Sequence, residues 1–457
     1  MDRAGFLRLE ASMTGLPSPD EVEGWLRRLW PIMRSITGAG QRLTHDMLAE
    51  LVPFDHWDIP SGTRILDWEV PREWVFRRAT LEDPAGRRIL DAAEHTLHLV
   101  NYSQPFQGSL DLAELQPHLH SLPDRPWAIP YVTSYYAPHW GFCLSDEMRA
   151  GLAEGRYGVT IDTEMIDGVM RVSDCVLPPS PGEEDGGEVL FSSYSCHPSM
   201  ANNELSGPLV LAFLYRALAA LPRRRMTYRF VLGPENVGSI AYLSRHGEHL
   251  RQRLRAGYVL TNIGDRQPLS LKKSQRGDTL AERAAIQAFT DRDIPHRLLD
   301  FDPRGADERN YCSPGYNFPV CALMRSYFQQ NPAYHTSDDN LDFVTAESII
   351  AAVEACVDIC RVIEANRIWR NTAPFGEPFF SRHDLAPTLS TPGVSADRQL
   401  LARRWLLNQC DGSRDILAIA QRCHMPVALL AEQAAILAQA GLLAPGSDHA
   451  VSHHLRG

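Results

Sequence analysis

The spacing of hydrophobic and polar positions changes several times along the chain. Residues 19–36 place apolar side chains at helical spacing, which predicts an amphipathic helix. From about residue 68 to residue 177, short alternating segments interrupted by Pro and Gly predict an all-β region. After the turn-rich segment 178–188, apolar runs of strand length alternate with helical patterns. This last alternation is typical of a mainly parallel sheet with helices on both faces.

Four apolar runs after residue 188 are predicted as strands, and a helical pattern follows each. The strands are 189–195, 228–233, 257–263 and 319–324, and the helices are 206–221, 239–254, 279–292 and 345–366. The first helix has Ser206 as its expected N-cap and Pro208 in its first turn. We therefore expect an α/β fold into which the β-rich region is inserted.

These patterns divide the chain into four parts. An α/β domain is expected at 19–66 and 181–370, with an inserted β-rich domain at 67–180. A Pro-rich linker at 371–393 leads to a small module at 394–457. In that module, two apolar helical faces separated by a short turn predict a helix-turn-helix that resembles a winged helix.

Composition narrows the classes of function. The chain of 457 residues is 44% apolar and has a formal net charge of −11, which argues against nucleic acid as a partner. No apolar run reaches the ~18 residues of a membrane span, and we find no secretion signal, so we expect a cytoplasmic protein without a membrane partner. The nine scattered Cys contain no CxxC pair, which favours reduced thiols over a disulfide framework or a Cys-based zinc site.

Polar side chains stand beside the predicted strands, mostly just after the strand ends. In open α/β sheets, ligands bind at the carboxyl ends of the strands. The candidates are His197, Glu235, Asp265, Asp307, Glu308 and His335. Two His and several carboxylates suit zinc, which takes nitrogen and oxygen ligands. Each residue alone is also explained as a turn or capping residue, but together they predict a metal site.

Four longer motifs carry a resemblance to a known family. They are CHPSMANNELSG, GSIAYL, GADERNYCSPGYNFPV and YHTSDDNLDF. Through them the chain resembles the zinc aminopeptidase-like proteins of peptidase clan MH, relatives of bacterial leucyl aminopeptidases and glutaminyl cyclases. It is most similar to a bacterial subgroup with an inserted β domain and a C-terminal winged helix, and the resemblance spans nearly the whole chain.

The resemblance implies roles for individual residues. His197 and His335 match the family's first and last His ligands. Glu235 matches the catalytic base that precedes a ligand, and is expected as base, ligand or both. Asp265 is the shifted counterpart of the Asp that closes the third strand, and is expected as a ligand. Asp307 matches an Asp that steers protons or substrate, and is expected to be catalytic.

Two positions depart from the family pattern. Asn203 falls on the metal-bridging Asp, and Asn236 falls on the ligand that follows the base. A neutral Asn cannot bridge two cations as a carboxylate does, so we expect one Zn²⁺ per chain. Glu204 is expected to replace the missing charge as a metal ligand.

The implied reaction is hydrolysis of an amide or peptide bond in a small aminoacyl or peptidyl substrate. Zinc would lower the pKa of its water, and Glu235 would act as general base. The side chains expected around the substrate are Asn203, Arg276, Glu308, Arg309, Tyr311, Arg325 and Tyr334. The acidic groups would hold an ammonium and the arginines a carboxylate. Structural salt bridges and core aromatics are the alternatives for these residues.

Other functions stay open on the sequence alone. Asn203 and Asn236 favour a metal-poor pseudoenzyme that binds an aminoacyl ligand or a protein partner. An acyl-transfer or cyclising enzyme would use the same site. A transcription regulator would need basic residues on its second helix, but residues 426–440 contain no Lys or Arg. We therefore expect the C-terminal module to serve packing, protein contacts or homo-oligomerisation. The resemblance also suggests a role in the biosynthesis of polysaccharides or secondary metabolites.

Overall fold

The computed structural model describes residues 15–385 and 395–446. Within these ranges the chain forms two compact units. The first unit contains residues 15–281 and 296–354, and the second contains residues 282–295 and those from 355 onward. Among the described residues, no helix is long and apolar enough to cross a membrane.

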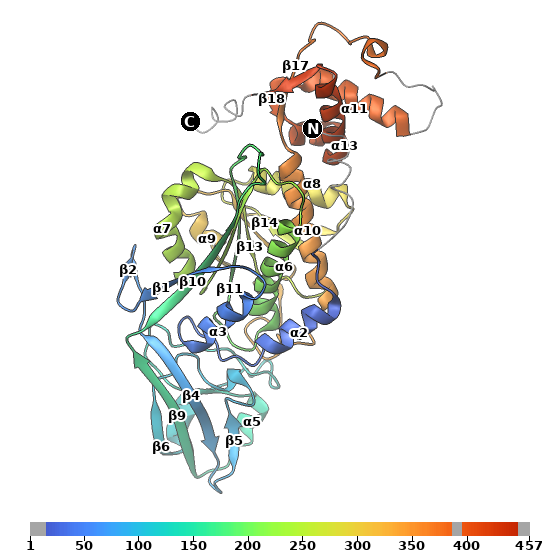
Figure 1. The fold of residues 1–457 in the computed structure, drawn as a ribbon. Helices are drawn as coiled ribbons and strands as arrows, with labels where there is room; N and C mark the ends of the chain where they lie inside the picture. The colour runs from blue at the N-terminus through green and yellow to red at the C-terminus, as the bar shows by residue number, and fades with distance from the viewer. Residues whose placement is uncertain (1–14, 386–394, 447–457) are drawn as a thin grey trace. The chain divides into compact units, whose positions relative to one another are not determined.

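An eight-stranded sheet forms the centre of the first unit (Figure 1). Its strands, in spatial order, are β1 (Asp55–Pro60), β10 (Val169–Leu177), β12 (Thr227–Gly233), β11 (Glu188–Tyr194), β13 (Leu254–Leu260), β16 (Val320–Met324), β14 (Leu269–Lys272) and β15 (His296–Leu299). β11 pairs in parallel with β12 and β13, and β13 pairs in parallel with β16. The predicted α/β fold with a mainly parallel sheet is therefore confirmed.

Helices cover both faces of this sheet. Those of the first unit are α2 (Pro19–Leu29), α3 (Ala39–Leu48), α6 (Gly207–Ala219), α7 (Val237–Arg253) and α9 (Glu308–Tyr311). α3 and α6 lie on one face, and α7 and α9 lie on the other (Figure 1). Two further helices, α8 (Leu280–Asp291) and α10 (Ala346–Ala365), each run from the first unit into the second.

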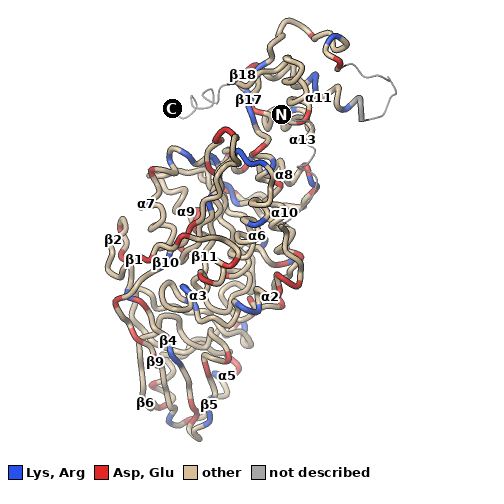
Figure 2. The backbone as a smooth tube through the Cα atoms, viewed as in Figure 1, with Lys and Arg blue, Asp and Glu red and all other residues tan. Residues whose placement is uncertain are grey.

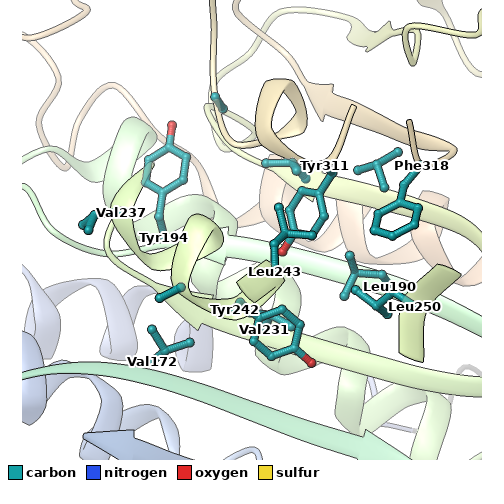
Figure 3. Packing of buried hydrophobic residues seen from close by; sticks show 14 of the residues in the cluster. Val172, Leu190, Tyr194, Val231, Val237, Tyr242, Leu243, Leu250, Tyr311 and Phe318 are labelled. Atoms are coloured by element: carbon teal, nitrogen blue, oxygen red, sulfur yellow. The ribbon is translucent and has the colours of Figure 1, made fainter. Parts of the chain in front are cut away.

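The core between the sheet and the α7–α9 layer is built from large side chains. Figure 3 shows Leu243 and Tyr311 packed close together, with Tyr242 and Phe318 nearby. All four are at most 4% exposed. Full burial of a side chain of this size contributes about 1.5–3 kcal/mol. The prediction that Tyr311 lines a substrate pocket is wrong, because its ring is in this core and its hydroxyl donates to Ser192 Oγ at 3.1 Å.

A second, antiparallel sheet carries its own core. Its order is β5 (Arg88–Asp91), β4 (Glu73–Glu82), β9 (Arg156–Ile166) and β6 (Phe106–Asp111). The shorter elements of the first unit are β2 (Arg64–Ile65), β3 (Trp68–Glu69), α4 (Leu112–Leu115), β7 (Leu119–His120), β8 (Phe142–Cys143) and α5 (Asp146–Ala150). β10 was predicted inside the inserted domain, but it pairs with β1 and β12 of the large sheet. The inserted β region thus ends before β10.

The second unit contains the winged helix. Its elements are β17 (Ile368–Asn371), α11 (Ser395–Gln409), β18 (Asp411–Asp415), α12 (Ile416–Cys423), α13 (Val427–Gln439) and β19 (Leu443–Pro445). β17 was predicted almost wholly in the α/β domain, but it pairs with β18 and β19. Residues 386–394 and 447–457 of the predicted linker and module lie outside the described residues. Figure 2 marks Lys and Arg, and α13 carries neither.

A buried ion pair joins β14 to the first residue of α9. Lys272 Nζ lies 2.6 Å from Glu308 Oε1, and both side chains are 0% exposed. Lys272 also donates to the carbonyl of Arg304 at 2.5 Å. Glu308 was predicted to hold a substrate ammonium. That prediction is wrong, because its carboxylate is fully buried against Lys272.

Removing one member of this pair should destabilise the protein strongly. We expect Lys272→Met to lower the free energy of unfolding by about 3–5 kcal/mol, because Glu308 would be left buried without its counter-charge. Lys273→Met is the matched control, since the neighbouring lysine pairs with Asp300, whose side chain is 91% exposed. It should cost less than about 1 kcal/mol. Urea unfolding measures both, and equal losses would contradict the ion-pair interpretation.

His45 should make stability depend on pH. Its ring is fully buried between Ser173 Oγ at 2.6 Å and Gln41 at 3.0 Å, and burial lowers the pKa to about 3. The unfolded chain therefore takes up a proton near pH 6.5 before the folded protein does, so stability falls as pH falls from 6.5 towards 3. Between pH 6.5 and 4.5 the loss from His45 should be about 2–3 kcal/mol.

The comparison is with His45→Gln, which retains hydrogen-bonding groups but has no proton to gain. Urea unfolding at pH 6.5 and 4.5 should show a smaller loss in the variant by that amount. The same loss in both proteins would show that His45 does not titrate as its burial implies.

Candidate metal centre

The parallel strands β11, β12, β13 and β16 end at one edge of the sheet, and the predicted ligands follow them. His197 Nε2 lies 3.9 Å from Glu235 Oε2. The imidazole rings of His197 and His335 are 5.2 Å apart between their centroids. The structure thus brings together three side chains that are up to 138 positions apart in the chain. They lie close together because each follows the carboxyl end of a strand, and these strands lie near one another in the sheet.

A buried carboxylate orients His197. Glu204 Oε1 lies 2.5 Å from His197 Nδ1, and the Glu204 side chain is 0% exposed. Its other oxygen accepts the backbone N–H of His197 at 2.8 Å and that of Cys196. Burial lowers the pKa of His197, but the attraction of Glu204 raises it, and the net shift is upward. Because Nδ1 is held by this carboxylate, Nε2 is the ring nitrogen left to bind a ligand.

Glu204 is placed by an unusual segment, a π-helix over Ala201–Ser206 that precedes α6. Such segments are rare and are found often at functional sites. Ser206 is the N-cap residue of α6, as predicted, but its side chain makes no capping hydrogen bond. Its hydroxyl donates to the Asn202 carbonyl at 2.5 Å and accepts from Ile263 N. The backbone N–H groups of Asn202 and Asn203 donate instead to Asp339, at 2.6 and 3.0 Å. Burial raises the pKa of Asp339 to about 7.

His335 presents a ring nitrogen with no partner. Its Nε2 is buried and makes no hydrogen bond. The ring stacks on Tyr334 with centroids 3.8 Å apart and meets the Tyr131 ring edge-on at 5.2 Å. Burial lowers the pKa of His335 to about 3, so the imidazole is neutral near pH 7. Neutral imidazole is the form that binds zinc.

Glu235 and Asp307 lie beside the two histidines. The side chain of Glu235 is 19% exposed, and burial raises its pKa to about 7, with Asp307 adding to the rise. Asp307 Oδ1 accepts the Asn236 N–H at 2.7 Å and the Ser239 hydroxyl at 2.9 Å. Burial raises the pKa of Asp307 to about 6. The half-buried Arg309 attracts both carboxylates.

Backbone strain is concentrated in the same loops. Ser199, Asn236, Asn262 and His335 all have φ between 45° and 66°. This left-handed region costs most for residues other than Gly and Asn. Such conformations persist where the surrounding structure holds them, and they cluster at ligand sites. The strain supports the choice of this edge as the functional centre.

Three further residues reach the site, and the sequence analysis singled out none of them. Arg34, which is 0% exposed, donates from Nε to the His197 carbonyl at 2.9 Å. Tyr131 lies with its ring centroid 4.6 Å from that of His197, and its hydroxyl meets the Tyr135 hydroxyl at 2.5 Å. Both tyrosines belong to the segment WAIPYVTSYY, in which no local sequence pattern shows which aromatics face the site.

Asp265 and Asn203 have other partners. Asp265 accepts from Asn202 Nδ2 at 2.9 Å and from the Gln267 N–H at 2.8 Å. It was predicted as a metal ligand, and in this structure both of its carboxylate oxygens accept these hydrogen bonds. Asn203 was predicted to bind substrate, but it is 1% exposed, donates to Glu204 Oε1 at 3.1 Å and accepts from Asn262 at 3.0 Å.

The three arginines that were predicted to bind a substrate carboxylate have different surroundings in the structure. The Arg325 guanidinium donates to three backbone carbonyls, those of Ile263, Gln267 and Ser348. The prediction that it binds a substrate carboxylate is therefore wrong. Arg276 is exposed in the turn after β14, and the contacts of the centre described above do not include it. Of the three, Arg309 is the one whose charge acts on Glu235 and Asp307.

One further grouping is relevant to metal binding. Within residues 15–385 and 395–446, Cys196, His197 and Glu204 have donor atoms within 4.8 Å of one another. All three are buried, and burial raises the pKa of the Cys196 thiol well above its usual range. A catalytic metal needs an open position, which this enclosed group does not offer.

Comparisons with known proteins agree with this fold. The family described as "Domain of unknown function (DUF4910)" matches residues 24–366, and a winged helix-turn-helix family matches residues 367–445. A Clostridium acetobutylicum protein is 34% identical over 405 residues, which cover 89% of this chain and 92% of that protein. Its name assigns it provisionally to polysaccharide biosynthesis and gives it an aminopeptidase-like domain.

Solved structures show the same architecture. A protein of Clostridium acetobutylicum, provisionally named a peptidase, has a TM-score of 0.85 and 33% identity, covering 96% of this chain and 98% of its own. A zinc aminopeptidase from Bacillus subtilis has a TM-score of 0.53 at 14% identity, covering 75% of this chain and 94% of its own. The latter likeness concerns the fold alone. The chain belongs to the DUF4910 family, and it combines an aminopeptidase-like α/β fold with a C-terminal winged helix.

Proposed function

We propose that the protein is a zinc-dependent hydrolase that cleaves an amide bond in a small aminoacyl or peptidyl compound. The observation that carries this proposal is the convergence of His197, Glu235 and His335 at one sheet edge. The aminopeptidase-like fold supports a peptidase-like activity. The name of the Clostridium acetobutylicum relative also supports a biosynthetic setting that involves polysaccharide.

The residues present fit a zinc ion. His335 Nε2 is buried without a partner, and His197 Nε2 is free because Glu204 holds Nδ1. We propose these two nitrogens as ligands, with the Glu235 carboxylate within reach of the same position. Nitrogen and carboxylate donors are the usual zinc ligands. Zinc, when bound, supplies Lewis-acid polarisation and lowers the pKa of a bound water.

Glu204 is better suited to positioning His197 than to direct binding. One of its oxygens accepts two backbone N–H groups, and the other accepts from His197 Nδ1 and Asn203. A carboxylate on the far nitrogen of a metal-binding imidazole fixes the tautomer and the ring orientation. The neutral Asn203 does not supply a bridging carboxylate, so one metal ion per chain remains our expectation.

Glu235 is our candidate for the general base. Its carboxylate lies 3.9 Å from His197 Nε2, which places it beside the proposed metal position, where a general base would take and return a proton. It would accept a proton from the attacking water and pass it to the leaving amine. Asp307 raises the pKa of Glu235 and fixes the start of α7 through Asn236. Arg309 provides a positive charge at the same rim for a substrate carboxylate.

The aromatic wall supports a small substrate. Tyr131 lies against both histidine rings, and Tyr334 stacks on His335. Tyr135 closes the wall through its hydroxyl contact with Tyr131. Bulky rings held this closely leave little room beside the metal position, so a short aminoacyl group fits better than a long peptide.

Metal content tests the ligand assignment. We expect about one zinc per chain in protein purified without a His-tag, measured by elemental analysis. His197→Ala and His335→Ala should each lose it, because each removes one of the proposed nitrogen donors. His249→Ala is the matched control, since His249 pairs with Glu188 instead, and it should retain the metal. Protein that takes up no zinc after incubation would contradict the proposal.

Replacing the proposed general base should lower turnover while leaving zinc binding largely intact. Glu235→Gln should retain most of the zinc if the two histidines dominate binding, while kcat falls by about 10²–10⁴. Hydrolysis of chromogenic aminoacyl anilides measures this. Glu248→Gln, a change at an exposed glutamate on α7, should leave kcat unchanged. Wild-type turnover in Glu235→Gln would remove Glu235 as the base.

A further inference from the structure

A pocket of about 390 Å³ is lined in part by Asn331 and Pro332, which belong to the turn that leads to His335. The turn is closed by a hydrogen bond from the Tyr334 N–H to the Asn331 carbonyl at 3.2 Å. Asn331 lines the pocket, whereas Tyr334 faces His335. The residues that line the pocket include neither His197 nor Glu235. Its volume is in the ~300–1,000 Å³ range of small-molecule sites.

This pocket carries more positive than negative side chains, whereas the chain as a whole has a negative net charge. Arg266 and Arg297 line it, with Asp265 as the acidic residue among the lining side chains. The guanidinium of Arg325 is close enough to Asp265 to interact with its charge. The side chains of Arg266 and Arg297 are both exposed and therefore accessible to a ligand. In a protein of net charge −11, a pocket with an excess of guanidinium groups favours an anionic ligand.

Neutral polar groups complete the lining. Asn331 is 6% exposed, and its amide Nδ2 is buried without a hydrogen-bond partner, while its Oδ1 accepts the Ala333 N–H at 3.0 Å. Gln267 also lines the pocket, and its Oε1 accepts from Arg297 at 3.2 Å. A buried donor without a partner is expected to be satisfied by a ligand or water. Amides pair well with hydroxyl groups, which both donate and accept.

Aromatic rings supply the apolar part of the wall. Tyr327 and Phe343 line the pocket and are each half-buried. Apolar walls with a few oriented polar groups are typical of small-molecule sites. A free inorganic anion would use the arginines but would leave the rings and the Asn331 amide without a partner.

We propose that this pocket binds an anionic sugar, that is, a hydroxyl-bearing ring with one carboxylate or phosphate group. Arg266 and Arg297 hold the anionic group, the Asn331 amide donates to a ring hydroxyl, and the aromatic rings contact the C–H face. This proposal does not depend on the hydrolase function, because no pocket residue is a proposed zinc ligand.

Isothermal titration calorimetry on the full chain tests the proposal with D-glucuronate, glucose 1-phosphate, neutral glucose and inorganic phosphate. We expect at least one charged sugar to bind about tenfold or more tightly than glucose and than phosphate. Arg266→Gln should weaken that binding by about tenfold. Arg276→Gln, which removes an exposed arginine outside the pocket, should not change it. Treatment with a chelator should also leave binding unchanged.

Several results would overturn the proposal. No binding of either charged sugar at about 10 mM would do so, as would equal effects of Arg266→Gln and Arg276→Gln. Phosphate binding as tight as that of the charged sugars would remove the sugar from the proposal. Sugar binding that disappears on chelation, or in His335→Ala, would place the ligand at the metal centre instead.

Discussion

The organisation of the site depends on the charge of one fully buried carboxylate. Glu204 has no exposure to solvent, and removing a carboxylate from water costs several kcal/mol unless hydrogen bonds and opposite charge compensate it. The compensation comes from two backbone N–H groups after β11, from His197 and from the nearby cation of Arg34. One side chain thereby fixes the end of a strand, the start of a helix and the orientation of an imidazole.

Backbone strain is concentrated around Glu204. The π-helix that presents Glu204 departs from regular helix geometry, and the left-handed backbone at Ser199 and His335 departs from ordinary loop geometry. Left-handed residues of this type cost on the order of 1–3 kcal/mol each. The dense hydrogen bonding of Asp339 and Glu204 to the surrounding backbone offsets this cost. A site held in this way has its geometry before any ligand arrives, which lowers the entropic cost of binding.

The sequence predicted the elements well where the signal was local. Continuous apolar runs identified the strands of the parallel sheet, and the strand ends located His197, Glu235 and His335. The sequence could not identify partners distant in the chain. Glu308 reads as a surface acid until Lys272 is found beside it, and Arg325 reads as a free cation until three carbonyls surround it. Arg34 was missed for the same reason, because its partner, the His197 carbonyl, lies 163 positions away.

The inserted β region has a consequence for how this protein family diversifies. Tyr131 belongs to that region, yet its backbone N–H donates to the His335 carbonyl and its ring contacts both histidines. The insertion therefore forms one wall of the candidate metal centre rather than an appendage of the sheet. In a chimaera between family members, the aromatic wall around Tyr131 would be inherited with the insertion, while the two histidines would be inherited with the sheet. The two features can evolve on separate segments of one chain.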